Sequence, residues 1–133
     1  MACELCSGVG GELLWHDHLC RVVLIEDARY GGYCRVILNR HVREMTDLGE
    51  FERARIMSVV FATEASLREL LQPDKINLAS FGNMTPHVHW HVIPRFRDDS
   101  HFPNSIWGEA KREGARHSVD AVALGHALNA KLD

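Results

Sequence analysis

The amino-acid sequence predicts an α+β domain in which an antiparallel sheet packs against one long helix. Four short segments are rich in β-branched and other apolar residues, as strands are. Between the second and the third of them lies a longer segment whose apolar residues recur at helical spacing. The resulting order, β-β-α-β-β followed by a peripheral helix, is typical of a sheet that carries its helix on one face.

Length and charge restrict the classes of protein that the chain can represent. With 133 residues and a mass of 15.1 kDa, the chain fits one domain that can bury a core without disulfides. Its 15 Lys and Arg against 18 Asp and Glu give a net charge of −3. That balance offers no electrostatic attraction to nucleic acid or to an anionic membrane, so we expect neither among its partners.

The first two predicted strands lie in the N-terminal third of the chain. Leu19 to Ile25 has β-branched residues with few polar interruptions and ends at Glu26-Asp27. A turn through Gly31-Gly32 leads to the second strand, the apolar run from Cys34 to Leu38. Both strands are expected in the antiparallel sheet.

The long helix is predicted to begin after Asp47 and to end before Pro73. Asp47 is a favourable N-cap, and Glu50 three residues later completes a pattern like a capping box. A mainly apolar stripe continues at helical spacing: Leu48, Phe51, Ile56, Val59, Val60, Thr63, Leu67, Leu70 and Leu71. This stripe is expected to face the sheet.

Two further strands and a short helix complete the predicted fold. Lys75 to Phe81 forms the third strand, and His87 to Ile93, which lies between two prolines, forms the fourth. The tail after the fourth strand is polar and contains scattered Pro and Gly. Within it, a short amphipathic helix is predicted over Val119 to Leu132, beginning near Ser118 or Asp120.

The fourth strand carries the most informative residues. Because side chains alternate between the two faces of a strand, His87, His89 and His91 share one face, spaced about 7 Å apart. The residues between them share the other face and are apolar: Val88, Trp90 and Val92. A polar strand face without function and a structural metal site are the alternatives. The strict alternation favours a functional site.

The run His87-Val88-His89-Trp90-His91-Val92-Ile93 resembles the signature of the histidine triad (HIT) family, His-φ-His-φ-His-φ-φ, in which φ is apolar. Pro94-Arg95 matches the pair that often follows this signature. The resemblance implies the fold of the Hint-like and Fhit-like branches, a bent antiparallel sheet packed against one long helix. Residues 1–133 are therefore expected to form a single HIT domain, with a core at about 3–95 and a C-terminal extension over 96–133.

The same resemblance implies hydrolysis or transfer at the α-phosphate of a nucleotide. His89 is expected to attack phosphorus and form a nucleotidyl-histidine intermediate, which water then releases. His91 is expected to bind phosphate oxygens, and His87 to position the loop or to ligate a metal. No cofactor is expected to be required for catalysis. The expected substrates are dinucleoside polyphosphates, such as diadenosine tetraphosphate, or nucleoside phosphoramidates. The alternative is a non-catalytic nucleotide-binding or zinc-stabilised regulatory protein of the same fold.

Residues around the triad resemble the substrate contacts of the family. Asn77 matches an Asn or Gln of the preceding strand, and Asn83 stands where the family has Gln in Gly-Gln-Ser/Thr. Met84 occupies the position of the Ser or Thr that donates to phosphate or leaving group, and Thr85 could replace it. Asp27 matches an acid that binds ribose hydroxyls. For Asn77 the alternative is strand-edge hydrogen bonding, and for Asp27 a solvated turn.

A possible metal site begins at the N-terminus. Cys3-Glu4-Leu5-Cys6 is a C-x-x-C pair, which needs two further ligands to hold tetrahedral zinc. Spacing alone offers the nearby His16-Asp17-His18, whereas the resemblance implies His41 and His87. A structural zinc on Cys3, Cys6, His41 and His87 is therefore predicted. Two free thiols are the alternative.

Two residues of the tail invite a functional interpretation. Trp107 could stack on a base, but no polar base-reading residue stands beside it, which favours covering the core or contacting another subunit. Arg95 could bind phosphate, but a lone arginine is more often solvated. Neither residue is assigned to the site.

Location and assembly follow from the N-terminus and from the resemblance. The first residues lack a basic region followed by an apolar run, and the longest apolar stretches are too short to cross a bilayer. A cytoplasmic location is therefore expected. Because family relatives are commonly homodimers, the resemblance implies a homodimer here.

Overall fold

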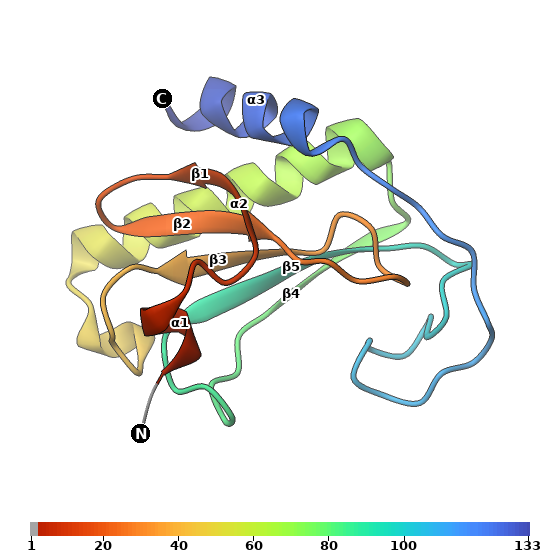
Figure 1. Ribbon diagram of the computed structural model, residues 1–133, viewed down its shortest axis with the longest axis horizontal. Helices are drawn as coiled ribbons and strands as arrows, with labels where there is room; N and C mark the ends of the chain where they lie inside the picture. The colour runs from red at the N-terminus through yellow and green to blue at the C-terminus, as the bar shows by residue number, and fades with distance from the viewer. Residues whose placement is uncertain (1–2) are drawn as a thin grey trace.

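The computed structural model describes residues 3–133 and contains one five-stranded sheet (Figure 1). The strands are β1 (Glu12–His16), β2 (Cys20–Leu24), β3 (Cys34–Leu38), β4 (Lys75–Ala79) and β5 (His89–Arg95). Their spatial order is β1-β2-β3-β5-β4, and each neighbouring pair is antiparallel. The predicted α+β class and antiparallel sheet are confirmed.

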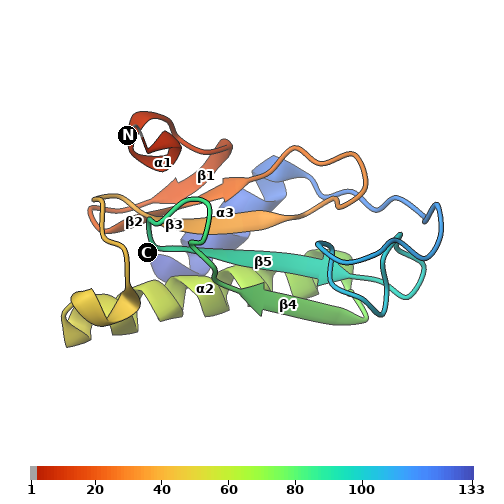
Figure 2. The ribbon, with the colours of Figure 1, turned by 90° about the horizontal axis from the view of Figure 1, so that it is seen from below.

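The helices lie on the two faces of the sheet. Within residues 3–133 they are α1 (Glu4–Ser7), the 3₁₀ turn η1 (Met45–Asp47), α2 (Glu50–Leu71) and α3 (Ala121–Leu132). Figure 2 shows α2 below the sheet and α1 above it. α3 packs against α2 and β1 and shares their core. The face opposite the two long helices is the one that carries the histidines. Over the described residues, no helix has the length and apolar character needed to span a membrane.

The sequence pattern does not predict β1. This strand is short and polar at both ends, and its pairing with β2 is irregular between Leu13 and Trp15. The irregularity interrupts the alternation of apolar and polar side chains that marks a strand in a sequence. Trp15 is nevertheless buried in the core, so β1 extends the sheet by one strand beyond the prediction.

The two strands near the triad are shifted relative to the prediction. β4 ends at Ala79 rather than Phe81, and β5 begins at His89 and continues through Pro94. β3 pairs with β5 only as far as Val92, so beyond that residue β4 is the single neighbour of β5. The missing N–H of Pro94 can therefore face the side without a neighbouring strand.

The start of α2 also differs from the prediction. Asp47 is the last residue of η1, too early in the chain to cap α2, and the N-cap is Gly49. The Gly49 N–H donates to Glu52 Oε1 at 3.1 Å, so Glu52 rather than Glu50 closes the first turn. Arg40 donates to the same carboxylate oxygen at 3.0 Å.

The apolar stripe of α2 is only partly buried. Its buried members face the sheet as predicted: Ile56, Val59, Val60, Thr63 and Leu67. Phe51, in contrast, is 91% exposed and Leu70 is 41% exposed. Phe51 lies about 140° around the helix axis from Ile56, away from the face that meets the sheet.

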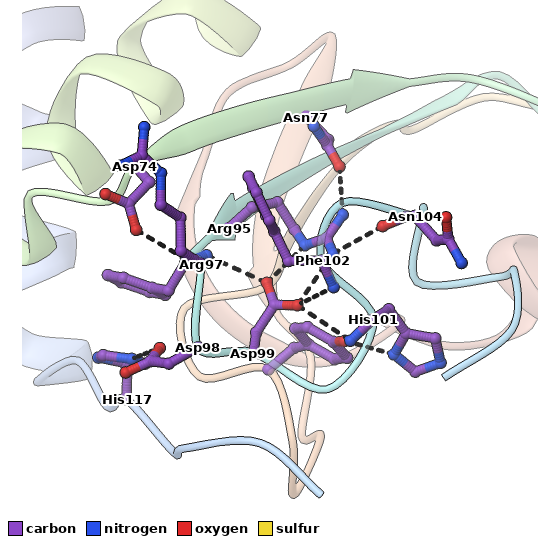
Figure 3. A network of polar contacts seen from close by, with 12 residues as sticks. Asp74, Asn77, Arg95, Arg97, Asp98, Asp99, His101, Phe102, Asn104 and His117 are labelled. Atoms are coloured by element: carbon purple, nitrogen blue, oxygen red, sulfur yellow. Dashed lines mark hydrogen bonds and ion pairs between the residues drawn. The ribbon is translucent and has the colours of Figure 1, made fainter. Parts of the chain in front are cut away.

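Arg95, at the end of β5, anchors the C-terminal extension (Figure 3). Its side chain is only 2% exposed, so the expectation of a solvated arginine is wrong. Nε donates to Asp99 Oδ2 at 2.8 Å, Nη1 to Asn77 Oδ1 at 2.7 Å and Nη2 to the Asn104 carbonyl oxygen at 2.8 Å. Asp99 also accepts three backbone N–H groups of its own loop. This network holds the segment after β5 against the end of the sheet.

Asp99→Asn is expected to destabilise the protein, because it leaves the Arg95 guanidinium buried without its anionic partner. Breaking a buried ion pair from one side costs about 3–5 kcal/mol of unfolding free energy, which urea denaturation measures. Lys131→Gln breaks an exposed pair with Glu69 and serves as the control, with a far smaller effect. An Asp99→Asn protein as stable as the wild type would contradict the anchoring role.

The same carboxylate predicts how stability depends on pH. Burial raises the pKa of Asp99, but hydrogen bonds from Arg95 and from backbone N–H groups outweigh it and lower the pKa to about 2. In the unfolded chain the pKa is about 3.9, so the stabilisation is complete above about pH 4 and decreases at lower pH. The free energy of unfolding of the wild type, measured in urea, should therefore fall more steeply between pH 4 and 2 than that of Asp99→Asn. Parallel pH profiles would contradict the assignment.

Candidate active site

His89 is fixed by the backbone of its own strand. Its Nδ1 lies 2.6 Å from the carbonyl oxygen of His87, and because a carbonyl oxygen only accepts, Nδ1 carries the proton. In the neutral ring, Nε2 therefore keeps the free lone pair. Ser80 Oγ donates to the carbonyl oxygen of His89 at 2.7 Å, which ties β5 to the end of β4. The His89 side chain is thus held in one orientation.

His91, the next residue on the same face, is a neutral imidazole. Burial, together with the neighbouring charges of His89 and Arg35, lowers its pKa to about 4. The Tyr33 hydroxyl lies 2.7 Å from His91 Nδ1, and burial raises the pKa of Tyr33, so the hydroxyl keeps its proton. This contact with Tyr33 fixes the orientation of the His91 ring.

A pocket of about 390 Å³ opens beside these two histidines. Its lining comes from Glu4, Arg35, residues 81–85, the two histidines and Trp107. The Phe81 and Trp107 rings meet edge to face with centroids 4.9 Å apart, and the Trp107 ring lies 4.9 Å from that of His91. Trp107 is 49% exposed, so it forms a wall of the pocket instead of covering the core.

Of the four residues expected to bind substrate, two line the pocket and two lie elsewhere. Asn83 and Thr85 line the pocket. Asn77 accepts from Arg95 and lines a separate groove beside β4. Asp27 Oδ1 accepts the Arg29 N–H at 2.8 Å in the turn after β2. The role of each in substrate binding stays a prediction.

Cys3, Cys6, His41 and His87 form a cluster of possible metal ligands. Their donor atoms all lie within 4.8 Å of one another. His87 Nδ1 is 3.4 Å from each Sγ and 3.3 Å from His41 Nδ1. Ligand atoms around a tetrahedral ion with bonds near 2.2 Å are about 3.6 Å apart, so this donor set fits zinc. The cluster contains the four predicted ligands and none of the alternative His16-Asp17-His18.

Two sets of contacts hold parts of this cluster in place. His87 Nε2 lies 2.6 Å from the Leu38 carbonyl oxygen, so Nε2 carries the proton and Nδ1 keeps the lone pair for a metal. Arg21 donates to the carbonyl oxygens of Leu5 and Val9 at 2.7 and 2.8 Å, which fixes α1 on the sheet. His87 therefore faces the cluster and is not part of the pocket lining.

Two residues beside the triad, Tyr33 and Arg35, are not predicted from the sequence. Arg35 is a charged residue within the otherwise apolar strand β3, and that interruption is a signal that sequence analysis could use. Tyr33 offers no such signal. Its contact with His91 joins residues 58 positions apart, which only the register of the sheet brings together.

Comparison with protein families identifies the family of the chain. A family model described as the HIT domain matches residues 10–98, which is more than half of the chain. The protein therefore belongs to the histidine triad family.

Solved structures share the fold. A histidine triad protein from Bradyrhizobium japonicum is 28% identical, with a TM-score of 0.71 and 92% of each chain covered. One from Marinobacter aquaeolei VT8 is 25% identical, with a TM-score of 0.74 and coverage of 99% of this chain and 95% of that one. A Zn-bound histidine triad family protein from Mycobacterium smegmatis is 24% identical, with a TM-score of 0.65 and coverage of 99% and 94%. The HIT fold is thus shown.

A curated relative carries the name of an activity. It is an AP-4-A phosphorylase from Mycobacterium tuberculosis, 28% identical over 83 residues. The match covers 58% of this chain and 43% of that protein, so the chain spans less than half the length of this relative.

We expect His91 to titrate far below an ordinary histidine. Its buried position predicts a midpoint near pH 4, so the ring should remain neutral through pH 6. Ring carbon and nitrogen shifts, followed by NMR on histidine-labelled protein, report this midpoint directly. A midpoint near the ordinary value of about 6.5 would show that the ring is solvated and would contradict the neutral His91.

Proposed function

We propose that this protein is a nucleotide hydrolase or transferase that acts at the α-phosphate through a nucleotidyl-His89 intermediate. The observation that carries the proposal is the 2.6 Å contact of His89 Nδ1 with the His87 carbonyl oxygen, which leaves the Nε2 lone pair free in a residue that lines the pocket. Membership of the HIT family and the name of the AP-4-A phosphorylase relative support the same class of reaction.

The reaction requires two displacements at phosphorus. The His89 Nε2 lone pair forms a bond to the α-phosphorus while the bond to the leaving group breaks, and that electron pair leaves with the departing oxygen or nitrogen. Water, or another acceptor, then displaces His89 and releases the nucleotide. We propose that the neutral His91 donates to a phosphate oxygen through its Nε2–H. Each of these residues is already oriented by a contact of the folded protein.

Substrate contacts are proposed for the residues around the pocket. Asn83 and Thr85 are proposed to donate to phosphate, and their place in the lining of the pocket that contains His89 supports this. Asp27 is proposed to bind ribose hydroxyls, and Asn77 to act through the Arg95 network that supports the pocket wall. Dinucleoside polyphosphates and nucleoside phosphoramidates are the proposed substrates.

Met84 supports a second candidate, a nucleotide-binding protein without catalysis. Its thioether replaces the hydroxyl that donates to the leaving group in the family, and its side chain is 96% exposed. Incubation with diadenosine tetraphosphate and with an adenosine phosphoramidate, followed by chromatography of the products, separates the two candidates. Release of AMP or ATP supports the enzyme, whereas tight binding without turnover supports the binding protein.

A structural zinc is proposed for the cluster of Cys3, Cys6, His41 and His87. The ion would join α1 to the start of β5 and would supply no step of the reaction, because the proposed nucleophile is a ring nitrogen. The Zn-bound relative from Mycobacterium smegmatis supports this proposal. A homodimer is proposed from the family resemblance, and light scattering at micromolar concentration tests it. A cytoplasmic location is also proposed.

Protein purified without chelator is expected to contain about one zinc per chain, measured by plasma mass spectrometry. Cys3→Ser and His41→Ala should release the ion, because each removes one of the four ligands. His16→Ala is the matched control and should retain it. If His16→Ala lost zinc and His41→Ala retained it, the ligands would be His16 and its neighbours instead of His41. Wild-type protein without metal would contradict the zinc site altogether.

His89→Asn is expected to abolish turnover of diadenosine tetraphosphate while AMP binding largely survives. Asparagine keeps a polar side chain of similar reach but cannot form a phosphoramidate bond, so the loss should be several orders of magnitude. His126→Asn, on the exposed face of α3, is the matched control. More than about a tenth of wild-type kcat in His89→Asn, a loss under about 1.4 kcal/mol, would exclude His89 as nucleophile.

A further inference from the structure

Arg35 lies on the face of the sheet that carries the histidines. Its Cα pairs with that of His91 across β3 and β5. Its side chain lines the same pocket as His89 and His91. A permanent positive charge therefore stands directly beside the proposed reaction centre.

The guanidinium of Arg35 forms no ion pair with any Asp or Glu among residues 3–133. Its Nε is buried and has no hydrogen-bond partner. Its neighbour Tyr33 has its ring centroid 5.9 Å from Cζ, and the guanidinium lowers the pKa of the Tyr33 hydroxyl, against the larger effect of burial. A buried donor without a partner is unfavourable, and an anion bound in the pocket would supply the missing acceptor.

Other arginines on this side of the sheet are fully engaged by the protein. Arg95 donates to Asp99, Asn77 and Asn104, and Arg21 donates to three backbone carbonyl groups and to Asn39. These two arginines hold loops in place. Arg35 holds no loop, and its position in the pocket wall points to a ligand as its partner.

The proposed reaction needs a cation at this place. Attack on the α-phosphorus concentrates negative charge on the non-bridging oxygens. His89 is occupied as the nucleophile, and His91 is neutral at pH 7 because burial lowers its pKa to about 4. Among the described residues that line the pocket, Arg35 is the one that keeps a full positive charge at every physiological pH.

We propose that Arg35 binds the non-bridging oxygens of the α-phosphate and stabilises the charge that develops there as His89 attacks. This inference rests on the proposed function. Arg35 keeps all its protons during the step: the His89 Nε2–phosphorus bond forms, the bond to the leaving group breaks, and the leaving group takes the electron pair. The planar fork of donors in a guanidinium matches two oxygens of one phosphate group.

Binding of AMP and of adenosine, measured by isothermal titration calorimetry, separates a phosphate contact from a contact with the nucleoside. Arg35→Leu should weaken AMP binding about tenfold or more, and leave adenosine binding within about twofold of the wild type. Arg35→Lys keeps the charge without the fork and should recover part of the loss. Arg68→Leu removes an exposed arginine of α2 and should bind both ligands as the wild type does.

Kinetics with diadenosine tetraphosphate give a second readout. The kcat of Arg35→Leu should fall about 100-fold, since the charge is needed most in the transition state. Thermal unfolding followed by circular dichroism checks that the variant is folded. If Arg35→Leu does not fold, the same measurements are made on Arg35→Lys, for which a smaller loss of AMP binding and of kcat is expected. The inference would be overturned if Arg35→Leu bound AMP and adenosine more weakly by the same factor, or if its AMP binding and kcat were unchanged. Turnover by the wild type would still leave the proposed function intact. A wild type that neither binds AMP nor acts on the substrates would overturn the proposed function itself.

Discussion

Two backbone carbonyl groups determine the chemistry of the histidine strand. The Leu38 carbonyl oxygen accepts from His87 Nε2, and the His87 carbonyl oxygen accepts from His89 Nδ1, each at 2.6 Å. Because a neutral imidazole carries one proton, each contact decides which ring nitrogen keeps its lone pair. In His87 it is Nδ1, which faces Cys3 and Cys6, and in His89 it is Nε2. Opposite tautomers at two neighbouring positions of one face thus give a single segment both a metal-binding side chain and a proposed nucleophile.

The two long helices cover one face of the sheet, and the proposed reaction centre lies on the other face. α2 and α3 bury the first face in the larger core. The second face carries His89, His91 and Arg35 beside two smaller apolar clusters. Burial on this face is what makes His91 neutral. The Arg35 guanidinium on the same face forms no ion pair with any Asp or Glu among residues 3–133. The buried pair of Arg95 and Asp99 holds the tail at the end of the sheet, from which Trp107 contributes a wall of the pocket. Stability and the geometry of the site therefore depend on the same buried ion pair.

Sequence patterns predict those features that depend on neighbouring residues. Alternation along β5 places His89 and His91 on one face. The C-x-x-C pair with the family resemblance predicts all four members of the metal cluster. Features that depend on distant residues are missed. Arg95, besides its pair with the nearby Asp99, donates to Asn77, 18 positions away, and the partner of Tyr33 is 58 positions away. The cap of α2 is misassigned because Asp47 belongs to a helical turn that local preference does not distinguish from the start of α2.

Covalent catalysis by His89 is the central claim, and mass spectrometry of the protein during turnover tests it most directly. A phosphorus–nitrogen bond to imidazole is labile in acid, so wild-type protein acting on diadenosine tetraphosphate should be denatured at neutral or alkaline pH. Intact mass should show one added nucleotidyl group per chain, and peptide fragmentation should place that group on His89. Turnover without any adduct, or an adduct on a residue other than His89, would contradict the claim.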